Sequence, residues 1–258
     1  MSNPEEVKVA EDIRNAYAAG AIAPVSARLG ETDIAAAYRV QAVNTDYWVK
    51  QGRRIVGKKI GLTSPVVQKQ LGVDQPDFGI LFGDMLVEDG ARADADKLLA
   101  GRIEAEVAIG LKSDLLGTDI SEADLRSAIS WLAPALEIVD SRIRDWKIKI
   151  TDTVADNASS AAFVLGKKRH WPVDFDVVDV TMRMRRDGEV VSEGKGSACL
   201  GSPLISCLWL AREMAKRGNP LRAGEVVLSG ALGPMVGITK GAAFEADIDH
   251  LGTVGVRF

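Results

Sequence analysis

The stretch Arg102–Ile109 constrains this chain most, because apolar and acidic residues alternate along it. Apolar residues occupy one set of alternate positions, and Glu104 and Glu106 occupy the other. Successive side chains of a β-strand point to opposite faces, so the two carboxylates face the same side. They repel each other unless a cation lies between them, and oxygen ligands alone suit a hard ion such as Mg²⁺ or Mn²⁺. A half-exposed strand with a solvated acidic face is the alternative interpretation.

A third carboxylate, Glu137, stands alone in the apolar run Pro134–Val139. Burying an unpaired charge is costly, so we expect Glu137 to be paired with a cation or bound to a metal. A salt bridge to Arg142 or Arg144 is the structural alternative, and the run itself does not decide between the two.

The composition excludes several classes of protein. The 258 residues are 47% hydrophobic and 26% charged, which is ordinary for a globular chain with a substantial core. A net charge of −4 without a basic block argues against a nucleic-acid partner. No apolar run is long enough to span a membrane, and the polar, acidic N-terminal residues are unlike a signal peptide.

Cysteine and histidine offer few candidates for chemistry. The only cysteines, Cys199 and Cys207, form neither a disulfide framework nor a metal-binding pair, so a reducing cytoplasm is expected. His170 follows a basic tripeptide typical of a surface loop, and His250 lies near the end of the chain. We expect both histidines at the surface, which leaves carboxylates, lysine, hydroxyls and a metal to carry any chemistry.

Periodicity and capping signals predict helices and strands mixed around one core. Helices are predicted over Pro4–Ala19, Thr32–Lys50, Ser64–Gln70, Ser121–Trp131 and Ser202–Lys216. Strands are predicted over Arg54–Leu62, Arg102–Ile109, Pro134–Val139, Ala161–Leu165, Val177–Arg185, Glu189–Ser192, Glu225–Ser229, Phe244–Ile248 and Thr253–Phe258. The predicted organisation is an N-terminal helical region, 1–52, followed by a larger domain, 53–258, which contains Glu104, Glu106 and Glu137.

Three local signals refine this outline. Gln75–Gly79 contains proline, aspartate and glycine and is predicted to be a turn, and Asp187-Gly188 predicts a hairpin. The glycines within Arg54–Leu62 indicate a bulge or the close approach of a ligand. The polar segment Asp140–Ala158 is predicted to be a long functional loop.

Six stretches of the chain are more specific than these general patterns. They are Val56–Thr63, Leu71–Gly79, Arg102–Glu106, Pro134–Trp146, Asp152–Ser159 and Ser229–Met235. Together they resemble the fumarylacetoacetate hydrolase superfamily and, within it, the 2-keto-4-pentenoate hydratases of aromatic meta-cleavage pathways. They occur in the family's order across nearly the whole chain, so the resemblance rests on six matches rather than on one short motif.

The resemblance implies an α+β fold in which a mixed, rolled β-sheet forms a barrel-like core beside an N-terminal helical layer. It also implies that Glu104, Glu106 and Glu137 bind one Mg²⁺ or Mn²⁺. The implied reaction adds water to 2-hydroxypenta-2,4-dienoate, the enol of 2-oxopent-4-enoate. Protonation at C5 and addition of water at C4 would give 4-hydroxy-2-oxopentanoate.

Motif by motif, the resemblance also implies roles for individual residues. Lys59 should reach the active site, with a lowered pKa, to orient the substrate carboxylate or transfer a proton, while Lys58 points to the other face. Asp77 is the candidate general acid or base, with a turn-forming aspartate as the alternative. Ser159 is the candidate hydrogen-bond donor to the substrate, and Ser160 competes with it.

Four further residues are expected around this group. Asp156 and Asn157 are interpreted as supporting partners or loop caps. Asp140 and Arg142 are expected to order the surroundings of the metal.

Several alternatives stay open. The closest is a 4-oxalocrotonate decarboxylase, although Ala231–Met235 resembles the hydratases more. A C–C hydrolase would need an assisting histidine in a family motif, and a hydratase of a longer dienoate is also compatible. A non-catalytic subunit of a decarboxylase–hydratase complex is the non-enzyme alternative. The family further implies a homo-oligomer, a pentamer or a decamer, and association with a pathway enzyme.

Overall fold

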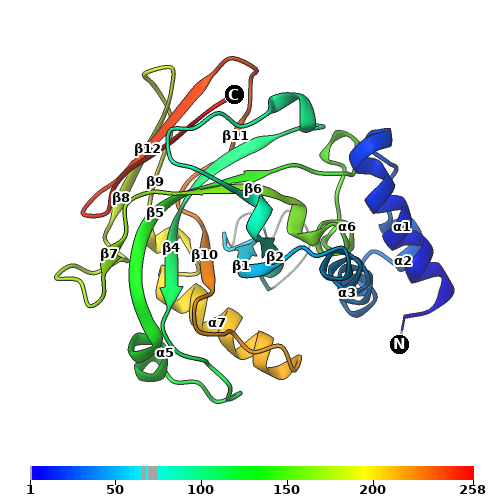
Figure 1. Cartoon of the computed structure of the whole chain (residues 1–258), viewed down its shortest axis with the longest axis horizontal. Coiled ribbons are helices and arrows are strands. Elements are labelled where there is room, and N and C mark those ends of the chain that lie inside the picture. Colours follow the sequence, from blue (N-terminus) through cyan, green and yellow to red (C-terminus); the bar gives the residue numbers. More distant parts are fainter. Residues whose placement is uncertain (1, 65–67, 69–74) are drawn as a thin grey trace.

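The computed structural model describes residues 2–64, 68 and 75–258. A curled, mixed β-sheet organises them, in the order β2-β1-β10-β4-β5-β6-β3, with β11 added on β4 and β7 on β5 (Figure 1). Its strands are β1 (Ile55–Gly61), β2 (Asp77–Phe82), β3 (Leu86–Val87), β4 (Arg102–Leu111), β5 (Ile129–Val139), β6 (Ser160–Leu165), β7 (Arg169–His170), β10 (Val226–Ala231) and β11 (Val236–Gly237). The pairs β1–β10 and β3–β6 are parallel and the other pairs antiparallel, which confirms the predicted mixed sheet.

A second, antiparallel sheet packs against β5. It has the order β13-β12-β8-β9 and consists of β8 (Thr181–Arg186), β9 (Glu189–Lys195), β12 (Ala243–Ile248) and β13 (Gly252–Arg257). Asp187 and Gly188 join β8 to β9, both with positive φ (53° and 89°). This is the two-residue geometry preferred in hairpins, so the predicted hairpin is confirmed.

The α-helices lie outside the main sheet. They are α1 (Pro4–Ala19), α2 (Ser26–Leu29), α3 (Ile34–Lys50), α5 (Glu122–Ala128), α6 (Ile150–Ala155) and α7 (Pro203–Lys216). The helix α1 has the predicted bounds, because Asn3 and Glu6 form a capping box and Gly20 follows the last turn. In Figure 1, α1, α2, α3 and α6 lie together at one side of the sheet, and α5 and α7 lie at another.

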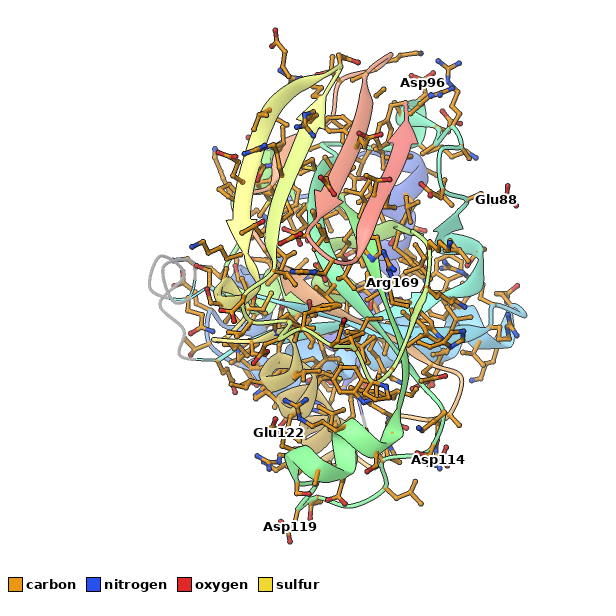
Figure 2. All side chains as sticks on the ribbon, turned by 90° about the vertical axis from the view of Figure 1, so that its left-hand side faces the viewer. Glu88, Asp96, Asp114, Asp119, Glu122 and Arg169 are labelled. Carbon is orange, nitrogen blue, oxygen red and sulfur yellow. The ribbon has the colours of Figure 1, made fainter. Side chains whose placement is uncertain are left out.

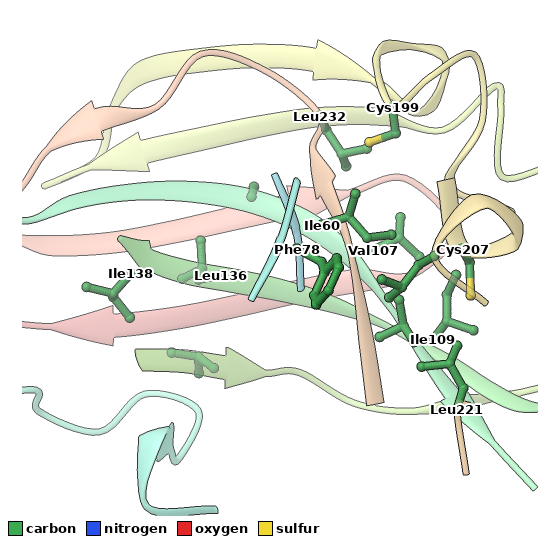
Figure 3. Close-up of a cluster of buried hydrophobic side chains, with 14 of the residues drawn as sticks. Ile60, Phe78, Val107, Ile109, Leu136, Ile138, Cys199, Cys207, Leu221 and Leu232 are labelled. Carbon is green, nitrogen blue, oxygen red and sulfur yellow. The ribbon is translucent and has the colours of Figure 1, made fainter. Parts of the chain in front are cut away.

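The hydrophobic core covers the apolar face of β4 and β5. Figure 3 shows Val107 and Ile109 of β4 near Phe78 and Ile60, with Leu136 and Ile138 of β5 in the same cluster. The opposite face of β4 is buried as well, since every residue from Ile103 to Leu111 is buried. The alternative of a half-exposed strand with a solvated acidic face is therefore wrong.

The N-terminal helices hold two elements of the site. Gln41 on α3 donates hydrogen bonds to the carbonyl oxygens of Phe78 on β2 (2.9 Å) and Val154 on α6 (3.0 Å). The ring of Tyr38 stacks on Phe78 at 4.4 Å between centroids. The first 52 residues thus share one core with the rest, and the division at residue 52 stays a prediction.

Three local predictions differ from the structure. Asp77 begins the strand β2 rather than lying in a turn, because β2 pairs with β1 along its whole length. The helix after Ser121 ends at Ala128, because Ile129 already pairs with β4. The segment 140–158 is not one loop, since it contains the buried helix α6. The helix predicted over Ser64–Gln70 falls largely outside the described residues.

The exposed charges lie apart from the buried ones. Figure 2 labels six residues with exposed side chains, namely Glu88, Asp96, Asp114, Asp119, Glu122 and Arg169. In the described ranges, no helix is both long and apolar enough to cross a membrane.

Candidate active site

The register of β4 and β5 brings three glutamates together. Glu104 lies directly opposite Glu137 across the antiparallel pair, and Glu106 follows two residues later on the same face. Each contributes one carboxylate oxygen to a group in which these atoms all lie within 4.8 Å of one another. Glu106 and Glu137 are fully buried and Glu104 is 7% exposed. Glu104 and Glu106 share one face, as alternation predicted, and Glu137 lies beside them, as the family resemblance implied.

The cluster is electrostatically unfavourable without a cation. Burial and the charge of Glu137 raise the pKa of Glu104 from 4.5 to about 7. The same causes, with Glu104, raise the pKa of Glu106. Among the described side chains nothing donates a hydrogen bond to Oε1 of Glu106 or Oε1 of Glu137. Like charges placed opposite each other and unsatisfied oxygens fit a site built to receive a cation.

A β-bulge positions Glu106. The pairing of β10 with β4 shifts between Leu228 and Ala231, and Gly230 has a φ of 101° there. Its N–H donates a 2.7 Å hydrogen bond to Oε2 of Glu106. A Cβ at Gly230 would lie 2.4 Å from the side chain of Thr63, so the close approach requires glycine.

Lys59 faces the glutamates from β1. Its Nζ is 3.1 Å from Oε2 of Glu137 and donates a 3.1 Å hydrogen bond to the carbonyl of Ala158. Lys58 faces the other way and pairs with Glu225, as alternation predicts. Glu137 thus pairs with Lys59, and neither Arg142 nor Arg144 is its partner.

The surrounding carboxylates decide the pKa of Lys59 in the metal-free protein. Burial alone would lower it, but Glu137, Asp77 and the other site carboxylates together raise it. The lowered pKa expected for Lys59 beside a bound metal stays a prediction. Lys59 is a fixed positive charge facing a surplus of carboxylates.

Asp77 lies across from Gly61 in the β1–β2 pair. Thr153 on α6 donates a 3.2 Å hydrogen bond to Oδ2 of Asp77, while Oδ1 accepts none in the described part of the chain. Burial raises the pKa of Asp77 more strongly than Lys59 lowers it. A carboxyl group with one free oxygen and a raised pKa is suited to move a proton.

Gly61 and Thr153 are two residues that the sequence reasoning missed. A Cβ at Gly61 would come within 2.2 Å of Oδ1 of Asp77. The glycine indicates close approach, as expected, but the approaching group is an aspartate of the neighbouring strand rather than a ligand. Thr153 carries no usable signal in the sequence, because its contact with Asp77 depends on α6, a short helix whose residues are all buried.

Ser159 lies on a tight turn that follows α6. Asn157, Ala158 and Ser159 all have positive φ, between 50° and 56°. Ser159 lines the main cavity and donates a 3.3 Å hydrogen bond to Oδ2 of Asp156. Ser160 is buried and does not line that cavity, so the geometry favours Ser159 as the residue that reaches a ligand.

The remaining predicted residues support the backbone. Asp140 accepts hydrogen bonds from the N–H groups of Leu99 and Ala100. Asn157 pairs with both backbone groups of Ile80. Arg142 pairs with Asp156. These contacts do not involve the glutamates, so the structure gives Asp140 and Arg142 a different role from the one expected.

One cavity of about 830 Å³ joins these groups. Lys59, Asp77, Glu104 and Ser159 line it, together with apolar side chains such as Leu232. At its rim, the guanidinium of Arg102 lies 4.6 Å above the ring of Trp146. Arg102 could have been found from its position two residues before Glu104, but nothing in the sequence places Trp146 there.

Comparison with known proteins places the chain in a family. The family model described as fumarylacetoacetate hydrolase C-terminal matches residues 58–258. A TodF product hydratase of Pseudomonas putida is 53% identical over 92% of this chain and 89% of its own length. A 2-keto-4-pentenoate hydratase of Burkholderia vietnamiensis is 49% identical over 100% of this chain and 99% of its own.

A solved structure gives the same result for the fold. The 4-oxalocrotonate decarboxylase of Pseudomonas putida G7, complexed with magnesium and adipate, superposes with a TM-score of 0.95. It is 34% identical and covers 100% of this chain and 98% of its own. The chain therefore belongs to the fumarylacetoacetate hydrolase family, and the two relatives described above that are about half identical to it are named hydratases.

Proposed function

We propose that this chain is a metal-dependent hydro-lyase that adds water to 2-hydroxypenta-2,4-dienoate and gives 4-hydroxy-2-oxopentanoate. The observation that carries the proposal is the meeting of the glutamate cluster with Lys59 and the free oxygen of Asp77 beside one cavity. The hydratase names of relatives about half identical to this chain support the same reaction.

Glu104, Glu106 and Glu137 would hold the metal ion. Their carboxylate oxygens fit Mg²⁺ or Mn²⁺, because both are hard ions and the cluster keeps oxygens without hydrogen-bond donors. The magnesium bound by the related decarboxylase supports this assignment. When bound, such an ion supplies a Lewis acid for a substrate oxygen.

Asp77 is proposed to move the protons. The raised pKa keeps its carboxyl group protonated to a higher pH than usual, so it can donate a proton to C5 of the dienol. The C2 hydroxyl releases its proton to solvent in the same step, so the double bond then lies between C3 and C4, conjugated with the ketone at C2. The water that adds its hydroxyl at C4 gives a proton to the carboxylate left on Asp77, which returns Asp77 to its starting state. The resulting enolate takes up a proton at C3 from solvent, which restores the C2 ketone.

Lys59 and Ser159 are proposed to act on the substrate without exchanging protons. The charge of Lys59 is fixed by Glu137 and by the carbonyl of Ala158, so it can stabilise the negative charge that develops on the C2 oxygen. Ser159 can turn its hydroxyl from Asp156 towards a ligand in the cavity. The apolar lining, which includes Leu232, suits the hydrocarbon end of the substrate.

A direct assay tests the proposed function. Freshly generated 2-hydroxypenta-2,4-dienoate is expected to lose its ultraviolet absorbance with Mg²⁺ or Mn²⁺ and to be stable towards the protein in EDTA. The substrate should gain the mass of one water. An unchanged rate in EDTA, or the absence of turnover with either metal, would contradict the proposal.

Decarboxylation is the second candidate, because the related decarboxylase has nearly the same fold. The same preparation should release no CO₂ from 2-oxohex-3-enedioate if the hydratase assignment is right. A faster reaction with a longer 2-hydroxydienoate would extend the substrate class and keep the chemistry. Failure of the isolated chain in a single turnover would favour a non-catalytic subunit.

The stability of the metal-free protein should fall as the pH rises from about 4.5 to 7. Over this range Glu104 is still protonated in the folded chain but ionised in the unfolded chain, because its pKa is raised to about 7. Ionising it in the folded state then costs about 3 kcal/mol of stability. Thermal melts in EDTA should therefore show a lower Tm at pH 8 than at pH 5, and Mg²⁺ should raise Tm more at pH 8.

The Glu104→Gln variant is the control for this experiment. It removes the titrating group and keeps the shape of the side chain, so its metal-free Tm should depend less on pH. A wild-type Tm that stays constant or rises between pH 5 and pH 8 would contradict the linkage.

We further propose a cytoplasmic homo-oligomer, a pentamer or decamer, that associates with another enzyme of its pathway. The resemblance to the hydratases supports the assembly, and two buried free cysteines suit a reducing compartment. Light scattering coupled to size-exclusion chromatography would measure the number of subunits, and a monomer would contradict the assembly.

A further inference from the structure

The backbone of the turn Asn157–Ser159 is strained. Three successive residues that are not glycine adopt the left-handed conformation, with φ of 56°, 50° and 54°. Each such residue costs about 1–2 kcal/mol, and the conformation persists only where the surroundings over-determine it. The turn directs the carbonyl of Ala158 to Nζ of Lys59 and places Ser159 against the cavity.

Arg142 donates hydrogen bonds to backbone carbonyls on both sides of this turn. The residue is 1% exposed, and its Nη2 donates a 2.6 Å hydrogen bond to the carbonyl of Asp156, just before the turn. Its Nη1 donates to the carbonyl of Ser160, just after the turn, at 3.3 Å. Its Nε and main-chain N–H donate to the two carboxylate oxygens of Asp156. The ring of Tyr17, from α1, lies 4.7 Å from the guanidinium carbon.

Two series of contacts connect the hydrogen bonds of Arg142 to the cavity. Asp156 uses Oδ2 to accept hydrogen bonds from both Arg142 and Ser159. Arg142 also holds the strained turn, in which the carbonyl of Ala158 accepts a hydrogen bond from Nζ of Lys59. A buried ion pair is weak support for stability, because desolvation offsets the attraction. The planar guanidinium donates to four acceptors, which are the carboxylate and carbonyl of Asp156 and the carbonyls of Asp140 and Ser160. This arrangement is better explained by the backbone geometry that it maintains.

We infer that Arg142 and Asp156 form a positioning clamp that holds Lys59 and Ser159 in their reactive places. The inference rests on the proposed function, since it needs Lys59 and Ser159 to act on the substrate. Among the described residues, Arg142 forms no hydrogen bond or ion pair with Glu104, Glu106 or Glu137, and its side chain holds the backbone on both sides of the turn. A change in the clamp should therefore alter the rate of the reaction and leave the metal ligands in place.

The test compares Arg142→Lys with a matched control, Lys58→Met. The first variant keeps the charge and loses the fork, so the turn can shift by a fraction of an ångström. We expect kcat to fall by about 100-fold while KM stays within threefold. Lys58→Met breaks another buried ion pair, on the opposite face of β1. Lys58→Met should lower Tm about as much as Arg142→Lys does, but it should keep kcat within threefold of the wild-type value.

A second substitution separates positioning from general loss of stability. Glycine adopts positive φ without strain, so Ala158→Gly relaxes the turn that the clamp must hold. In the Arg142→Lys background it should recover at least tenfold of the lost kcat. The affinity for Mn²⁺, measured by electron paramagnetic resonance of the free ion, should stay within threefold of wild type in both variants.

Two results would overturn the clamp. One is an equal loss of kcat in Arg142→Lys and Lys58→Met at matched Tm, which would make Arg142 merely structural. The other is a tenfold loss of Mn²⁺ affinity in Arg142→Lys, which would return Arg142 to the surroundings of the metal. Turnover by the wild-type protein is measured first, so that failure of the proposed hydratase activity is recognised before the clamp is tested. The comparison is then made with whichever substrate the wild type converts.

Discussion

Glu106→Gln is expected to abolish metal binding and turnover together. Glu106 is fully buried, and its Oε1 accepts no hydrogen bond among the residues described. An amide in its place removes one negative ligand and presents N–H donors towards Glu104 and Glu137. We expect Mg²⁺ affinity to fall by at least 100-fold and kcat to fall by about 1,000-fold. Isothermal titration calorimetry with Mg²⁺ and the ultraviolet assay measure the two effects.

The control for this variant is Glu245→Gln, which makes the same chemical change on the exposed face of β12. It should leave metal affinity and turnover unchanged. Because burial raises the pKa of Glu106, removing its charge should also raise the Tm of the metal-free protein. Near-normal activity of Glu106→Gln in metal-free buffer would end the proposed role of the cluster.

Lys59→Met is expected to abolish turnover while the metal site survives. The variant removes the only cation within 4 Å of the glutamate cluster in the described ranges, Nζ at 3.1 Å from Glu137. If Lys59 stabilises charge on the C2 oxygen, kcat should fall by about 1,000-fold. Mn²⁺ affinity should rise or stay constant, because a competing positive charge is gone.

Lys58→Met is again the matched control, since it alters the neighbouring residue on the opposite face of β1. Its turnover should remain close to that of wild type. A large rise in KM for Lys59→Met with an unchanged kcat would instead assign Lys59 to binding of the substrate carboxylate. Wild-type activity in Lys59→Met would remove it from the site altogether.

The alternation around Glu104 and Glu106 predicted the face that these side chains share, because side-chain direction in a strand follows from local geometry. It could not predict that β4 would pair with β5 in the register that sets Glu104 opposite Glu137. Register depends on contacts between segments distant in sequence. The isolated carboxylate in an apolar run was the informative signal for Glu137, since burial of a charge demands a partner.

Asp77 and the segment around α6 show where local signals fail. Pro76, Asp77 and Gly79 lie within four residues and favour a turn, but pairing with β1 extends the segment as a strand. The helix α6 is short and wholly buried, so it lacks the amphipathic pattern that identifies a surface helix. The hydrogen bond from Thr153 to Asp77 and those of Arg142 around the turn both depend on that helix. They could therefore be found only from the structure.

The resemblance to the family connected residues that the patterns left unassigned. Lys59, Asp77 and Ser159 lie on β1, on β2 and after α6, and their side chains meet beside one cavity. Nothing in the residues themselves links these positions, because each has an ordinary structural explanation. The geometry supports the set as a site, and the variants proposed above test each role.

The most direct measurement is the mass of the product made from 2-hydroxypenta-2,4-dienoate in the presence of Mg²⁺, with CO₂ release from 2-oxohex-3-enedioate measured on the same preparation. We predict that the first substrate gains one water in a metal-dependent reaction and that the second releases no CO₂. Metal-dependent CO₂ release without hydration of the dienoate would contradict this prediction and would assign the same glutamates, lysine and aspartate to decarboxylation.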